Sequence, residues 1–287
     1  MTINSIMTIN SIMNCVLNSI LGITLTIAIS SIPKSNTQAQ VTNFDNFFDW
    51  CNQKDNISPE AKRTVEAILV KFGTDDCSQA TQIASLTTRL NLISRQISDV
   101  KPIASLPNLT RLVLHNNQIS DLTPLASLTN LERLYLAQNK ISDITPLKSL
   151  TKLQELILSN NQVSNIRPLS SLTNLNKLFL LNNKISNITP LSSLTNLTEL
   201  NLSRNQISDI NPLASLTNLT ELNLSNNQIS DITALASLKK LTEINLNSNK
   251  VSNGNTLLSL PNLTEIYIHN NPVAKQVCPN NLDAICF

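Results

Sequence analysis

The stretch LTNLTELNLSNNQISDITALASL, residues 216–238, carries the pattern that decides the fold. It belongs to a 22-residue unit, L-x-x-L-x-L-x-x-N-x-I-S-D-I-x-P-L-x-x-L-T-N, that recurs without insertion or deletion. The unit starts at Leu109, Leu131, Leu153, Leu175, Leu197, Leu219, Leu241 and Leu263. Its asparagine recurs at Asn117, Asn139, Asn161, Asn183, Asn205, Asn227, Asn249 and Asn271. A fixed period of this length predicts a solenoid, in which each turn of chain stacks on the last.

Each unit combines a strand with a tight return. Apolar residues at positions 4 and 6 alternate with outward residues at positions 3, 5 and 7, which is the period of a β-strand. Asp or Asn at position 13 suits the cap of a short helical turn, and Pro at position 16 fixes φ. The asparagine at position 9 is an interior polar residue whose amide must satisfy backbone groups. We therefore predict an α/β solenoid with a parallel sheet on its concave face and short 3-10 or turn segments on its convex face.

An apolar, uncharged run, CVLNSILGITLTIAISSI, occupies residues 15–32. It is followed by Lys34 and by the stretch Thr37-Gln38-Ala39, which suits cleavage. We expect residues 1–39 to be a secretory signal peptide, with no stable membrane insertion after its removal. The alternative is a membrane anchor, for which the run is short.

Cysteine usage agrees with export. Of the five cysteines, four remain once Cys15 is removed with the signal peptide. They flank the repeats as two local pairs, Cys51 with Cys77 and Cys278 with Cys286. An even number in an exported chain favours disulfides, and spacings other than C-x-x-C argue against metal. We therefore expect one disulfide at each end of the array, and no metal or other cofactor.

Residues 40–86 carry helix signals in place of the repeat. The first predicted helix has an apolar face formed by Phe44, Phe47, Phe48 and Cys51. A second helix is expected to begin after Ser58, with Pro59 in its first position, and to end at Gly73. These helices are predicted to cover the apolar end of the first repeat as an N-terminal cap closed by a disulfide. The alternative is a separate binding domain.

The repeats occupy residues 87–272. They amount to about nine units of 22 residues if the degenerate first turn at 87–108 is included. After Asn271-Pro272 the pattern stops, and residues 273–287 are predicted to form a C-terminal cap with its own disulfide. Atypical units at both ends are typical of capped repeat arrays.

Charge and residue inventory argue against several classes of function. The formal net charge is +2, which gives no electrostatic argument for binding nucleic acid. The histidines, His115 and His269, occupy one column seven turns apart, about 34 Å, so they cannot share a metal or an active site. No nucleophile, base and orienting group are evident together. We predict that the chain is not an enzyme.

The repeat quoted above resembles the leucine-rich repeats of bacterial internalins. It is also similar to the 22-residue repeats of a eukaryotic protein phosphatase 1 regulatory subunit. The flanking segments, FFDWCNQKDNISPEAKRTVEAILVKFGTDDC at 47–77 and NNPVAKQVCPNNLDAICF at 270–287, resemble the caps of secreted cyanobacterial leucine-rich repeat proteins. This resemblance implies a right-handed horseshoe used for protein binding.

Outward side chains at positions 3, 5 and 7 should form columns, with neighbours about 4.8 Å apart. The first four units place an apolar stripe beside three cations, and the last four place Asn beside a column of Glu. An exposed apolar stripe rimmed by Arg and Lys has the makeup of a binding hot spot. The predicted contact surface comprises Arg111, Val113, Arg133, Tyr135, Ile157, Lys177, Phe179 and Leu181.

Each column also has a simpler explanation. β-Branched and aromatic residues suit strands and pack sideways on one another, without any partner. The Glu column is either inherited with the repeat or meets a basic partner.

These features together predict an exported, monomeric, non-enzymatic protein that binds another protein through its concave β-face. We expect it to be secreted, periplasmic or at the cell surface. The alternative is an intracellular regulatory subunit that docks a phosphatase or kinase along the same face. Free thiols in the purified native protein would favour that alternative.

Overall fold

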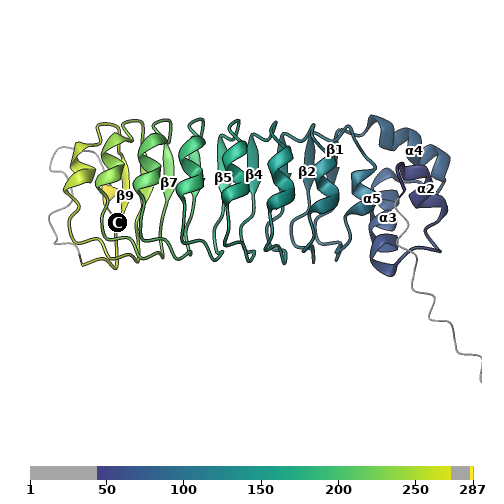
Figure 1. Ribbon diagram of the computed structural model, residues 1–287, viewed down its shortest axis with the longest axis horizontal. Helices are drawn as coiled ribbons and strands as arrows, with labels where there is room; N and C mark the ends of the chain where they lie inside the picture. Colours follow the sequence, from purple (N-terminus) through teal and green to yellow (C-terminus); the bar gives the residue numbers. More distant parts are fainter. Residues whose placement is uncertain (1–43, 273–284, 287) are drawn as a thin grey trace, which may run out of the picture. The chain divides into compact units, whose positions relative to one another are not determined.

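The computed structural model describes residues 44–272 and 285–286 (Figure 1). The predicted signal peptide at residues 1–39 lies outside these residues. So does Cys278, and with it the predicted Cys278–Cys286 disulfide. Within the described ranges, no helix is both long enough and apolar enough to cross a membrane.

Between residue 44 and the repeats the structure describes three helices: α2 (Phe47–Asn52), α3 (Pro59–Phe72) and α4 (Cys77–Leu86). Helix α3 begins and ends as predicted. The Ser58 hydroxyl accepts a hydrogen bond from the Ala61 N–H at 3.2 Å, and Gly73 adopts a left-handed φ of 74° after the last turn. A disulfide between Cys51 and Cys77 joins α2 to α4, with Cα atoms 5.5 Å apart.

The apolar face of α2 differs from the prediction. Phe48 is 40% exposed, whereas Trp50 is 2% exposed and lies in the core. The helix begins only at Phe47, so Phe44 does not share its periodicity. Instead the Phe44 carbonyl accepts a hydrogen bond from Trp50 Nε1 at 3.1 Å, and the two rings meet edge-on with centroids 5.1 Å apart. This contact draws Trp50 inward and leaves Phe48 facing outward.

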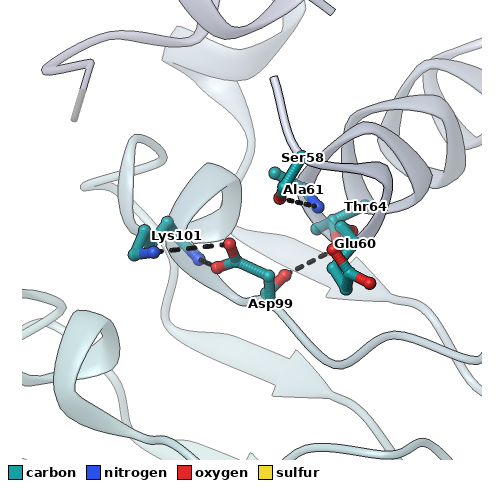
Figure 2. A network of polar contacts seen from close by, with 6 residues as sticks. All are labelled: Ser58, Glu60, Ala61, Thr64, Asp99 and Lys101. Atoms are coloured by element: carbon teal, nitrogen blue, oxygen red, sulfur yellow. Dashed lines mark hydrogen bonds and ion pairs between the residues drawn. The ribbon is translucent and has the colours of Figure 1, made fainter. Parts of the chain in front are cut away.

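A buried hydroxyl joins α3 to the first repeat (Figure 2). The Thr64 side chain is fully buried, and its Oγ1 donates to the Asp99 carbonyl at 2.6 Å. The Asp99 carboxylate accepts from the Lys101 backbone N–H at 2.9 Å and lies 3.5 Å from Lys101 Nζ. The helices therefore join the first repeat at a point where both the carbonyl and the carboxylate of Asp99 have partners.

Each repeat contributes one three-residue strand to a single parallel sheet, and the strands lie in sequence order (Figure 1). The strands are β1 (Arg89–Asn91), β2 (Arg111–Val113), β3 (Arg133–Tyr135), β4 (Glu155–Ile157), β5 (Lys177–Phe179), β6 (Glu199–Asn201), β7 (Glu221–Asn223), β8 (Glu243–Asn245) and β9 (Glu265–Tyr267). A short strand, β10 (Ile285–Cys286), pairs with β9. The register sets residues 22 apart beside each other, as with Leu134 and Leu156. The predicted solenoid is confirmed.

Short helical turns form the opposite wall. They are α5 (Lys101–Ala104) in the first repeat and the 3-10 helices η1 (Thr123–Ser127), η2 (Thr145–Ser149), η3 (Arg167–Ser171), η4 (Thr189–Ser193), η5 (Asn211–Ser215), η6 (Thr233–Ser237) and η7 (Asn255–Ser259). The position-13 residue lies one residue before the N-cap position of each 3-10 helix, as Asp121 does before Leu122. Asp121 Oδ1 accepts from the Thr123 N–H at 2.8 Å, because the buried Leu122 occupies the cap position itself.

The interior asparagine links each turn to the preceding one, as predicted. Asn183 Nδ2 donates to the Leu180 carbonyl of its own turn at 3.1 Å and to the Leu158 carbonyl of the preceding turn at 3.0 Å. Its Oδ1 accepts from the Val163 N–H at 2.9 Å. The same bonds recur at Asn117, Asn139, Asn161, Asn205, Asn227, Asn249 and Asn271.

Replacing one of these asparagines should weaken the whole stack. We expect Asn183→Leu to lower the free energy of unfolding by about 3 kcal/mol or more, because buried carbonyl and N–H groups lose their partner. Denaturant unfolding measures this loss. The control is Lys184→Leu, since Lys184 is exposed and uses only its backbone N–H within the stack. Equal losses in the two variants would contradict the role assigned to the amide.

Candidate protein-binding face

The outward side chains of the sheet form three columns, which together we call the sheet face. Each of the strands β3 to β6 buries its middle residue and leaves the outer two partly exposed. The charged column, at position 3, comprises Arg89, Arg111, Arg133, Glu155, Lys177, Glu199, Glu221, Glu243 and Glu265. The central column, at position 5, comprises Asn91, Val113, Tyr135, Ile157, Phe179, Asn201, Asn223, Asn245 and Tyr267. The third column, at position 7, includes His115, Ser159, Leu181 and His269.

Val113 was predicted as an exposed contact residue, and this prediction is wrong. Its side chain is only 7% exposed. Arg111 on β2 and His115, two residues after that strand ends, flank Val113, and both contact Tyr135 on β3. The Arg111 guanidinium lies 5.2 Å from the Tyr135 ring centroid, and the His115 ring stacks on it at 5.7 Å. Val113 itself lies beside Tyr135 in the register of β2 and β3.

The remaining apolar residues of the predicted surface lie together over β4 and β5. Ile157, Phe179 and Leu181 are all partly exposed on the sheet face. We call these three residues the apolar patch. Tyr135 continues the central column toward the N-terminal end and borders the patch.

Tyr135 is held by polar partners that the sequence prediction did not assign to it. Its hydroxyl donates to Glu155 Oε2, and partial burial together with this bond raises the pKa of Tyr135. The stacked ring of His115 accepts the Ala137 N–H at Nδ1, 3.0 Å away, and burial lowers the pKa of His115. At neutral pH the imidazole is therefore uncharged, and Arg111 is the cation against the Tyr135 ring.

Two predicted cations beside the patch are paired within the charged column. Arg133 Nε lies 3.2 Å from Glu155 Oε1, and Lys177 Nζ lies 2.5 Å from Glu199 Oε1. The hydrogen bond that Lys177 donates to Glu199 raises the pKa of Lys177. The signal for this pairing was present in the sequence, because opposite charges 22 residues apart occupy adjacent strands. The charged column beside the patch therefore carries two ion pairs.

The C-terminal half of the sheet face is acidic. Glu221, Glu243 and Glu265 follow one another in the charged column. Burial raises the pKa of Glu243, and the neighbouring Glu265 and Glu221 carboxylates raise it further. A shallow hollow of about 130 Å³ lies over this half, lined by Phe179, Glu199, Leu200, Asn201, Glu221, Leu222, Asn223 and Glu243.

The N-terminal end of the sheet face is basic. A hollow of about 260 Å³ lies there, lined by Lys71, Arg89, Leu90, Asn91, Arg111 and Val113. Lys71 comes from the last turn of α3, so the helical cap contributes to this end of the face. The two ends of the sheet face thus carry opposite charges, with the apolar patch between them.

The two histidines lie far apart in the sheet order. His115 lies two residues after the end of β2, and His269 lies two residues after the end of β9. Among residues 44–272 and 285–286, no group of three or more His, Cys, Asp or Glu side chains is placed to hold a metal ion. The side chains of this face can make apolar contacts, ion pairs and hydrogen bonds.

Comparison with known families agrees with this architecture. A family model described as Leucine Rich repeats (2 copies) matches residues 88–127, 107–149, 129–171, 151–193 and 195–237. The chain therefore belongs to the leucine-rich repeat family. No curated protein matches it.

Two internalins of Listeria monocytogenes have similar structures. The internalin InlF is 32% identical, with a TM-score of 0.63, over 74% of this chain and 70% of the internalin. Internalin C2 is 35% identical, with a TM-score of 0.67, over 71% of this chain and 91% of the internalin. The predicted likeness of the repeats to internalins is confirmed.

Two further structures are similar over part of their length. A leucine-rich repeat protein of Leptospira interrogans is 29% identical, with a TM-score of 0.62, over 66% of this chain and 50% of that one. The plant peptide hormone receptor RGFR1, solved in complex with RGF2, is 25% identical, with a TM-score of 0.56, over 65% of this chain and 36% of the receptor. Leucine-rich repeat proteins are in general protein-interaction scaffolds.

The crowded carboxylates should make stability depend on pH. The raised pKa of Glu243 means that the folded chain binds this proton more readily than the unfolded chain does. Stability therefore falls as pH rises through that pKa. We expect Glu243→Gln to raise the free energy of unfolding by a few tenths of a kcal/mol near pH 7. The gain should vanish below about pH 4.5, where both states are protonated.

Denaturant unfolding of the variant and the parent chain, at neutral pH and well below pH 4.5, checks this expectation. The matched control is Glu132→Gln, since Glu132 lies outside the charged column. A gain that is independent of pH, or that also appears in the control, would contradict the explanation by charge crowding.

Proposed function

We propose that this chain is an exported, non-enzymatic protein that binds another protein through the sheet face. The apolar patch of Ile157, Phe179 and Leu181 is the observation that supports this most directly. All three side chains are partly exposed on a regular sheet, and two ion pairs of the charged column lie on one side of them. An apolar centre with a charged rim is the makeup of specific protein interfaces.

The rigidity of the sheet face favours binding further. The strands hydrogen-bond to their neighbours, and their middle residues are at most 2% exposed. Arg133 and Lys177 are already held by neighbouring carboxylates. Little conformational freedom is therefore lost when a partner covers these side chains, which lowers the cost of association.

Similar structures support the same role. The plant receptor was solved in complex with RGF2, which is a precedent for ligand binding by a leucine-rich repeat chain. The likeness to proteins of Listeria monocytogenes and Leptospira interrogans supports a bacterial origin. We propose a secreted, periplasmic or cell-surface location, in line with the apolar N-terminal run.

Truncating the aromatic residues tests the proposed contact surface. We expect the double variant Tyr135→Ala/Phe179→Ala to bind a partner captured from the native secreted fraction at least about tenfold more weakly, because it loses central apolar contacts. Affinity is measured by titration with the purified partner. Thermal unfolding checks that both chains remain folded.

Tyr267→Ala is the matched control, because it removes an aromatic ring from the same column outside the patch. We expect it to bind the partner as the parent chain does. Unchanged affinity in the double variant, or an equal loss in the control, would overturn the proposed surface.

Export also has a direct chemical test. An exported chain should hold Cys51, Cys77, Cys278 and Cys286 as two disulfides, since disulfides persist in oxidising compartments. The protein is purified from its native source and denatured, and its thiols are then titrated. We expect no free thiol among these four until a reductant is added. Four free thiols at these positions before any reductant is added would contradict export and support the intracellular regulatory subunit instead.

A further inference from the structure

The first two cations of the charged column differ from the later ones. The cations on β3 and β5 are held by carboxylates of the next strand. Arg89 on β1 and Arg111 on β2 lie beside each other in the register of the sheet. Neither makes an ion pair with any residue that the structure describes. Adjacent like charges on neighbouring strands repel, so this pair favours a counter-anion.

A third cation joins them from the helical cap. Lys71 lies in the last turn of α3 and lines the same hollow of about 260 Å³ as Arg89 and Arg111. Its ammonium group has no carboxylate partner within the described ranges. We call this the basic hollow, and it is lined by Lys71, Arg89, Leu90, Asn91, Arg111 and Val113.

The polar side chains of the basic hollow offer hydrogen-bond donors. Lysine and arginine carry donors and no acceptor. Asn91 Oδ1 already accepts a hydrogen bond from the Ile93 N–H at 3.2 Å, whereas its Nδ2 donor group has no partner in the described part of the chain. The other two lining residues, Leu90 and Val113, are buried and apolar. Donors with positive charge on an apolar floor suit an oxyanion such as a carboxylate.

Arg111 is the side chain that would gain most from such an anion. Its Nε is buried and has no hydrogen-bond partner among the described residues. Its guanidinium lies 5.2 Å from the Tyr135 ring centroid, so one side of the group faces the ring. A charged group that is partly removed from water is unfavourable without a counter-ion. An anion on the outer N–H groups of Arg111 would offset this cost.

The rest of the sequence contains no carboxylate side chain close to this hollow along the chain. Residues 1–43 contain neither Asp nor Glu. The other residues outside the described ranges include one carboxylate side chain, Asp283. Asp283 is two residues before β10, which pairs with β9 at the opposite end of the strand order. We infer that the counter-anion comes from another molecule.

The order of charges along the column limits the length of that anion. From β6 to β9 the charged column consists of Glu199, Glu221, Glu243 and Glu265. A long polyanion such as a nucleic acid, lying along the sheet face, would meet these carboxylates and be repelled. A short acidic segment that ends before β6 avoids them.

We propose that the basic hollow binds the carboxylates of a short acidic segment of the protein partner, with Lys71, Arg89 and Arg111 as the cations that hold them. The proposal rests on the proposed function and specifies the chemistry of the partner. Lys71 and Arg89 are contact residues that the sequence prediction did not include.

The position of the apolar patch specifies the segment further. Ile157 lies two strands from Arg111, about 10 Å, and Phe179 lies three strands from it, about 14 Å. An extended chain advances about 3.3 Å per residue. A partner segment that starts in the basic hollow therefore reaches the apolar patch after about three or four residues. We expect the partner to carry apolar side chains at this spacing from its acidic residues.

Calorimetric titration with a synthetic peptide tests the proposal. The probe carries three consecutive glutamates, a short polar spacer, and then leucine and phenylalanine. We expect it to bind the purified chain, and to bind more weakly as ionic strength rises. The same peptide with glutamines in place of the glutamates should bind about tenfold more weakly, since each exposed ion pair contributes roughly a factor of two to five.

The double variant Lys71→Gln/Arg89→Gln tests the cations directly. Both side chains are exposed, so the fold should be retained. We expect about fivefold weaker binding of the glutamate peptide and no change for the glutamine peptide, a difference that general damage to the chain would not produce. The matched control is Lys148→Gln/Lys184→Gln, which removes equal charge from exposed positions outside the three columns. It should bind both peptides as the parent chain does.

Equal affinity for the two peptides, no measurable binding of the glutamate peptide, or an equal loss in the control overturns the carboxylate site. Binding of inorganic phosphate at the basic hollow without binding of the glutamate peptide also overturns it, because the anion would then not belong to a protein.

Failure of the proposed function gives a different result. Phe179→Ala should weaken both peptides if the apolar patch is a contact. If Phe179→Ala changes neither affinity while the glutamate preference persists, the carboxylate site stands and the patch is excluded. If Phe179→Ala weakens both peptides and the chain does not distinguish them, the patch stands and the carboxylate site is excluded.

Discussion

The amide of one interior asparagine per turn is the interaction on which the rest of this structure depends. Leucines fill the core without specifying how one turn sits on the next, since apolar contact is not directional. The asparagine donates to carbonyls of two successive turns and accepts from an N–H of the earlier one, as at Asn183. A buried amide that is satisfied only in one alignment sets the register of every strand.

That register determines the chemistry of the surface. Residues 22 apart become neighbours, so a substitution in one repeat changes the surroundings of the next. Arg133 meets Glu155 and Lys177 meets Glu199 for this reason. The same alignment crowds the acidic residues at the other end and raises the pKa of Glu243. A face of opposite charges around an apolar centre arises from small differences between otherwise equal units.

Residue types predicted the backbone well and the side-chain contacts less well. Ser58 and Gly73 act locally, so the bounds of α3 could be inferred from them, and the solenoid followed from its period. The alternation of residues along a strand predicts which way a side chain points. It does not predict which side chains of adjacent strands will contact it. Val113 occupies an outward position of its strand yet is buried, and its neighbours Arg111 and His115 both contact Tyr135 on the next strand. The ion pairs of Arg133 and Lys177 likewise depend on contacts between side chains of adjacent strands.

The asparagine bonds also limit how such a chain can change its length. Asn183 reaches back 25 residues to Leu158 and 20 residues to Val163. An insertion of one residue in a turn misplaces the amide, whereas gain or loss of a complete unit preserves every bond. The length of this scaffold can therefore change only by whole 22-residue repeats. Gain or loss of one unit lengthens or shortens the columns of side chains on the sheet face. It therefore changes which ligands fit that face.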